Sequence, residues 1–157
     1  MKSRKGLIIA LIISSILFSI SPLQANEAAE KAAVAASGAW LALVDKGAYS
    51  KSWDQAAEIF KTMVMKEEWQ TKLNTYRTPL GKVLERKVKS KQYTKTLVDS
   101  PEGEYVVLQC ETVFKNKQTI TETITSMLEK DGKWKVVGYY FTLLGQESQS
   151  SDEKKKQ

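Results

Sequence analysis

Residues 118–130 read QTITETITSMLEK, and Asp131-Gly132 follows directly. In this stretch Ile120, Glu122 and Ile124 share one parity, whereas threonines fill most positions of the other parity. A repeat of two residues is typical of a β-strand that turns one face toward a core. Asp-Gly is a strong signal for a tight hairpin. We therefore predict a strand over residues 118–130 that turns back into a second strand.

The same alternation extends to both sides of this stretch. It predicts three further strands, over residues 83–97, 104–114 and 133–143. Pro101-Glu102-Gly103 and Asn116-Lys117 separate the others as short turns. Parallel neighbours need long crossover connections, so strands joined this closely must be antiparallel.

The chain before Gly81 has a helical pattern. Residues 27–46 lack proline, and Gly47 follows them as an expected helix stop. The apolar stripe of this first helix is predicted to consist of Ala33, Ala36, Trp40, Leu43 and Val44.

Two shorter helices are expected after Gly47. Ser52 is predicted to cap a second helix, which places Trp53, Ala56, Ala57 and Phe60 on one face. A third helix over residues 66–76 turns Trp69 and Leu73 inward, and Thr78-Pro79 ends the helical part.

Helices followed by a meander of strands predict an α+β fold, with the N-terminal helices packed on one face of a curved four-stranded antiparallel sheet. We expect a single domain over residues 26–145, followed by a disordered polar tail over residues 146–157. Residues 1–25 combine a basic head, a short apolar run and a small-residue exit, which indicates a signal peptide cut after Ala25. The mature protein is therefore expected to be periplasmic or extracellular and not membrane-spanning.

Composition excludes several classes of function. Removal of the leader lowers the formal net charge from +6 to about +3, which is too little to indicate a nucleic-acid partner. The chain contains no histidine and one cysteine, Cys110. A metal site, a histidine-based catalytic triad and an intramolecular disulfide are therefore not expected, and no cofactor is predicted.

Several stretches carry a resemblance to a known family: residues 40–49 (WLALVDKGAY), 77–81 (RTPLG), 101–109, 122–125 and 131–140. Ser52-Trp53 and Arg86 continue the match. Together they resemble a family of exported bacterial proteins, domain of unknown function 4019, over about residues 28–143. The order of elements resembles the nuclear transport factor 2-like, or cystatin-like, fold. That resemblance implies a bent sheet wrapping a long helix, with a pocket at the wide end.

Glu122 is the candidate functional residue with the clearest signal. It shares parity with Ile120 and Ile124, so it is expected on the inner face of the sheet. A buried carboxylate needs a partner, and Arg77 and Arg86 flank the turn that precedes the first strand. Such a pair would be either a structural ion pair or part of a ligand-facing pocket, and the structural interpretation is favoured.

Four further residues are candidates for a pocket: Asp45, Tyr105, Tyr139 and Tyr140. In enzymes of the cone-like superfamily, an aspartate base and a tyrosine donor can face such a pocket. The favoured alternative is that Asp45 bonds the adjacent turn and that the tyrosines pack. The four tryptophans are likewise expected in the core rather than on a sugar-binding surface.

The parity of the strands also bears on Cys110 and on a row of lysines. Cys110 shares parity with Leu108 and is expected to be a buried core residue. Lys87, Lys89, Lys91 and Lys95 are expected on one face of the first strand, as a charged edge that discourages aggregation. Contact with an anionic surface is the alternative.

These observations favour an exported, non-enzymatic module that binds a small ligand or a protein partner. A homodimer through the free face of the sheet is a further expectation, because cone-like relatives form dimers through that face. The alternative is a small enzyme of the isomerase or dehydratase type that uses a carboxylate–tyrosine pair in the sheet pocket.

Overall fold

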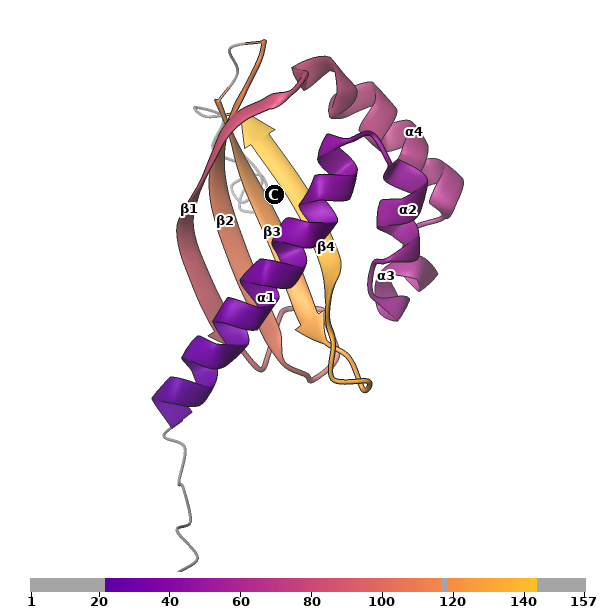
Figure 1. The fold of residues 1–157 in the computed structure, drawn as a ribbon. Helices are drawn as coiled ribbons and strands as arrows, with labels where there is room; N and C mark the ends of the chain where they lie inside the picture. Colours follow the sequence, from indigo (N-terminus) through magenta and orange to yellow (C-terminus); the bar gives the residue numbers. More distant parts are fainter. Residues whose placement is uncertain (1–21, 117–118, 144–157) are drawn as a thin grey trace, which may run out of the picture.

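The computed structural model describes residues 22–116 and 119–143. Its first half is helical and its second half is a four-stranded antiparallel sheet, which confirms the predicted α+β fold. Figure 1 shows α1 (Pro22–Asp45) lying diagonally across one face of a curved sheet. The predicted tail over residues 146–157 and residues 1–21 of the predicted leader lie outside the described part. Residues 22–25 of that leader belong to α1.

Four strands form the predicted meander in the order β1-β2-β3-β4. Each pairs with its neighbour in antiparallel register. The strands are β1 (Val83–Thr94), β2 (Tyr105–Phe114), β3 (Thr119–Leu128) and β4 (Trp134–Leu143). Gly132 adopts a positive φ of 77° in the β3–β4 turn, a conformation that favours glycine.

The helical region contains one break that the sequence pattern did not predict. The expected second helix is divided into α2 (Tyr49–Asp54) and α3 (Glu58–Met63). Ala57 is extended at the break, and its N–H donates to the carbonyl of Val136 on β4 at 2.8 Å. A continuous helix would have used that N–H internally, so pairing with the sheet accounts for the break.

Ser52 was wrongly predicted to be a helix cap. Ala48 is the N-cap of α2, whereas Ser52 lies inside the helix and is completely buried. Its hydroxyl donates to the Tyr49 carbonyl and accepts from the indole N–H of Trp69. The third predicted helix is confirmed as α4 (Lys66–Tyr76), and the short 3₁₀ helix η1 (Thr78–Leu80) follows it.

The core lies between the sheet and the helices. Trp40, Trp69 and Tyr139 meet at its centre, with ring centroids 5.5 to 6.3 Å apart. The buried stripe of α1 differs in part from the expectation, because Ala36 and Leu43 are only partly buried. The residues that α1 buries are Ala33, Ser37, Trp40, Leu41 and Val44. Ser37 is accommodated because its hydroxyl bonds that of Ser126 on β3 at 2.9 Å.

The predicted lysine face of β1 is wrong, because the register of the strand shifts between Val88 and Ser90. Lys87 pairs with Glu111, whereas Lys91 pairs with the buried Leu108. The extra residue at Lys89 reverses the parity of the strand beyond it. Lys91 thus extends toward α1, where its ammonium lies 3.2 Å from the Glu30 carboxylate.

Cys110 lies in the core as predicted, with 1% of its surface exposed. Burial, and then the negative charge of Glu122, raise the pKa of its thiol. We expect the folded protein to resist a water-soluble alkylating reagent near neutral pH, and the unfolded protein to react fully. Mass spectrometry after timed labelling measures both rates, and rapid labelling of the folded protein would contradict the placement of β2.

Candidate functional site

A cluster of charged side chains links the end of α1 to the inner face of the sheet. Arg86 is at its centre and bonds two carboxylates. Its Nε donates to Oε2 of Glu122 at 2.7 Å. Its two terminal nitrogens donate to the two oxygens of Asp45, at 2.8 and 3.0 Å. This arrangement uses the planar fork of a guanidinium, which a lysine could not reproduce.

The positions of these side chains follow from the sheet register. Arg86 pairs with Thr112 across β1 and β2, and Glu122 pairs with Cys110 across β2 and β3. Paired residues share a face of the sheet, so all four face the core. A register shift between Val83 and Glu85 sets this parity for Arg86.

Glu122 is completely buried and accepts hydrogen bonds from three side chains. Arg86 donates from Nε and from one terminal nitrogen, the hydroxyl of Tyr139 donates at 2.5 Å, and the hydroxyl of Thr112 donates as well. A carboxylate without exposed surface needs such donors to remain charged.

Arg77 joins the cluster through Asp45 and not through Glu122. One of its terminal nitrogens donates to Asp45 Oδ1 at 2.7 Å, and the other donates to the Gly81 carbonyl at 3.1 Å. The guanidinium lies 4.3 Å from the centre of the Phe114 ring. Arg77 thereby fixes the α4–β1 connection against the same aspartate that holds Arg86.

The charges of the cluster cancel, because two arginines face two carboxylates. Burial alone would lower the pKa of Arg86, but its hydrogen bonds to Asp45 and Glu122 raise that pKa above its ordinary value. Burial, followed by the charge and hydrogen bond of Glu122, raises the pKa of Tyr139 well above 10. The cluster therefore holds Arg86 protonated and the Tyr139 hydroxyl neutral.

The geometry favours the structural interpretation of Glu122 over a ligand-facing pocket. Glu122 and Thr112 have no exposed surface, and Arg77 is 3% exposed. Arg86 and Asp45 are the most exposed members of the cluster, with 19% and 24% of their side chains exposed. A substrate could not contact Glu122 without displacing its partners. The cluster instead holds together α1, the α4–β1 connection and the sheet.

The candidate pocket residues do not all meet at this cluster. Asp45 and Tyr139 belong to it, whereas Tyr105 and Tyr140 lie elsewhere. Tyr105 is buried beneath the β1–β2 connection, and its hydroxyl donates to the Pro101 carbonyl at 2.6 Å. Tyr140 is 69% exposed on the opposite face of the sheet. Thr112 was missed, although its even position on β2 predicts the inner face.

A separate hollow of about 400 Å³ lies at the β1–β2 connection, away from the cluster. Its lining residues are Lys95, Thr96, Glu102, Gly103 and Glu104.

The part of the chain that the structure describes contains no group of three or more cysteine, aspartate or glutamate side chains placed to hold a metal. None of its helices combines the length and apolar character needed to cross a bilayer.

The fold and the cluster define a small α+β domain whose helices are locked to an antiparallel sheet by buried ion pairs. The chain belongs to the protein family of unknown function DUF4019, whose model matches residues 36–139. The matched region includes every residue of the cluster, from Asp45 to Tyr139. No curated protein matches the chain significantly.

We expect Glu122→Gln to lower the free energy of unfolding by about 3 to 5 kcal/mol, because Arg86 would lose half of its buried counter-charge. Chemical denaturation of the two proteins measures the difference. Glu111→Gln is the matched control, because Glu111 lies on the other face with its carboxylate 3.6 Å from Lys89. Its loss should cost no more than about 1 kcal/mol. Equal stability of wild type and Glu122→Gln would contradict the structural role.

The Tyr139→Phe variant tests the cluster through the dependence of the free energy of unfolding on pH in alkaline solution. The raised pKa means that the neutral hydroxyl stabilises the fold. This stabilisation is complete below pH 10 and is lost as the pH rises from there toward the folded pKa. Above pH 10 the wild type should lose about 1.4 kcal/mol per pH unit more than Tyr139→Phe. Denaturation series at several pH values measure both slopes, and equal slopes would show that the hydroxyl titrates normally.

Proposed function

We propose that the protein is an exported, non-enzymatic module that binds another protein through the face of the sheet opposite α1. The low charge of this face over β2, β3 and β4 is the observation that carries the proposal. The residues on it are Val107, Gln109, Glu111 and Val113 of β2, Thr119, Thr121, Thr123 and Thr125 of β3, and Gly138, Tyr140 and Thr142 of β4. We call this set the outer sheet face.

Glu111 is the only charged residue among these positions of β2, β3 and β4, although charged residues make up 27% of the chain. The edge strand β1 turns Glu85 and Lys87 to the same side, so the charges of this face lie along its β1 edge. Depletion of charge and enrichment in tyrosine are typical of the centres of protein interfaces. The threonine hydroxyls of β3 supply hydrogen-bonding groups, and the exposed ring of Tyr140 supplies an anchor. The helices of the described part pack on the other face, so they leave this one free.

A second copy of the chain is one partner that this face would fit. The outer sheet face is nearly uncharged, so two copies could meet without opposing like charges. The resemblance to the nuclear transport factor 2-like fold supports the same choice, because cone-like relatives form dimers through their sheets. A different protein with a weakly charged surface would satisfy the same chemistry.

An isomerase or dehydratase is supported less well. Such an enzyme would need its carboxylate–tyrosine pair to reach a substrate. Glu122 and Tyr139 form that pair, but Glu122 is completely buried and bonded to Arg86 and Thr112.

The signal-peptide pattern supports export of the binding module, with Asn26 as its first residue.

A photocrosslinking amino acid at position 123 tests the proposal in the producing cell, and the same group at Thr71, exposed on α4, is the matched control. We expect a discrete adduct from position 123. We also expect to recover the protein from the extracytoplasmic fraction, with an intact mass that corresponds to a chain beginning at Asn26. Mass spectrometry then distinguishes a second copy from another protein.

A charge at the centre of the face should remove this interaction. We expect Thr123→Arg to weaken the complex by at least about tenfold, and Thr71→Arg to leave it unchanged. Equal adduct yields from positions 123 and 71 would contradict the proposed surface. Full-length protein with the leader attached would contradict the proposed export.

A further inference from the structure

The methionines of the described chain differ sharply in exposure. Met63 and Met65 are 62% and 70% exposed, whereas Met127 is partly buried against the core. Cys110, the single cysteine, is sealed in the core. The sulfur atoms that solvent can reach most readily are therefore concentrated at two positions of the sequence Met63-Val64-Met65.

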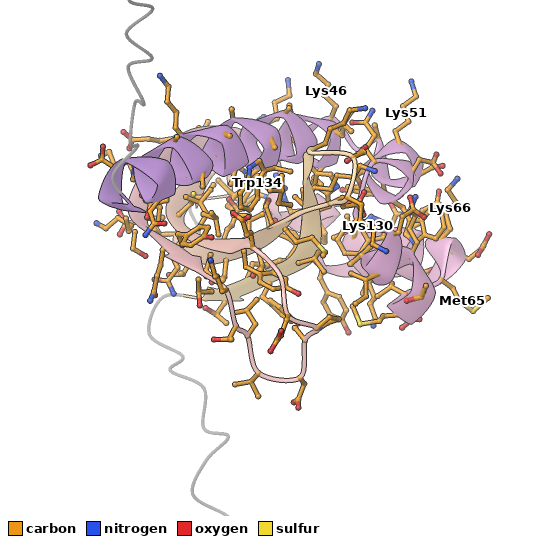
Figure 2. The ribbon with its side chains drawn as sticks, turned by 90° about the horizontal axis from the view of Figure 1, so that it is seen from below. Lys46, Lys51, Met65, Lys66, Lys130 and Trp134 are labelled. Atoms are coloured by element: carbon orange, nitrogen blue, oxygen red, sulfur yellow. The ribbon has the colours of Figure 1, made fainter. Side chains whose placement is uncertain are left out.

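Met63 and Met65 flank the short connection between α3 and α4. Met63 ends α3, Met65 is the N-cap of α4, and Val64 between them is extended. Both methionine side chains are largely exposed, whereas Val64 between them packs against the core. Figure 2 shows Met65 at the edge of the molecule, projecting from the surface.

The backbone of this connection is held firmly although its two side chains are free. The carbonyl of Val64 accepts the indole N–H of Trp53 at 2.7 Å, and its N–H donates to the Phe60 carbonyl at 3.0 Å. The carbonyl of Met65 accepts the N–H of Trp69 at 2.9 Å. Val64 packs against the core, so a change at either thioether would leave these contacts in place.

We propose that Met63 and Met65 form a site of reversible oxidation by two-electron oxidants of the hypochlorous acid class. A sulfur lone pair attacks the chlorine of HOCl, so an S–Cl bond forms, the O–Cl bond breaks and hydroxide leaves. Hydroxide then attacks the sulfur, an S–O bond forms and the S–Cl bond breaks. Chloride and the hydroxyl proton leave, so each event yields one sulfoxide and one molecule of HCl.

The fold tolerates this reaction at these two positions. A sulfoxide is polar and disrupts packing when it forms in a core. At Met63 and Met65 the new S=O group would project into water, where it costs no buried contact. A methionine sulfoxide reductase could also reach both residues, which makes the modification reversible.

Limited oxidation of the folded protein tests the proposal. Two equivalents of hypochlorous acid are added, and peptide mass spectrometry follows the gain of one oxygen at each methionine. We expect Met63 and Met65 to oxidise at least about fivefold faster than Met127, with Cys110 unmodified. In denaturant the three methionines should react at similar rates, which is the internal control. Equal rates in the folded protein would overturn the proposal.

Two further measurements separate a reversible site from damage. The oxidised protein should keep its melting temperature, and a mixture of methionine sulfoxide reductases should return both residues to methionine. Met63→Leu/Met65→Leu should keep the same melting temperature and should gain fewer oxygens per chain, with a difference of at most two. A fall in melting temperature on oxidation, or sulfoxides that the reductases leave unchanged, would overturn the proposal.

Discussion

The guanidinium of Arg86, held between two carboxylates, is the interaction on which the rest of the structure depends. Arg86 lies on the edge strand β1 and connects the last residue of α1 to the third strand of the sheet. Arg77 adds the α4–β1 connection through the same aspartate. A buried charge is costly without its counter-charge, so removal of any of these groups leaves another uncompensated. The cluster thus specifies one position of the helices over the sheet.

Much of this arrangement could be predicted from the sequence. The alternation in residues 118–130 places Glu122 on the inner face, and the short turns require an antiparallel meander. The boundaries of α4 follow from its apolar spacing and from Pro79. Each of these predictions depends on a local pattern, either a period of residues or a turn that limits the path of the chain.

Features that depend on distant neighbours were missed or wrong. The register shifts of β1 insert single residues without a compositional signal, so the alternation of lysines wrongly predicted that they share one face. Ser52 has the composition of a cap, but the indole of Trp69 uses its hydroxyl inside the core. Sequence left Arg77 and Arg86 as equal candidates for Glu122. Their assignment depends on how the strands pair, which neither residue reveals by itself.

The separation of the cluster along the chain has a consequence for the order of folding. Arg86 bonds residues 41 positions before it and 36 positions after it. While the chain is synthesised from its N-terminus, α1 and β1 are complete long before Glu122 is available. Contacts of this range require closure of long loops and therefore form late. Until β3 emerges, Asp45 is the only carboxylate of the cluster that can face its two arginines, so the helical half and the sheet should acquire their final packing together.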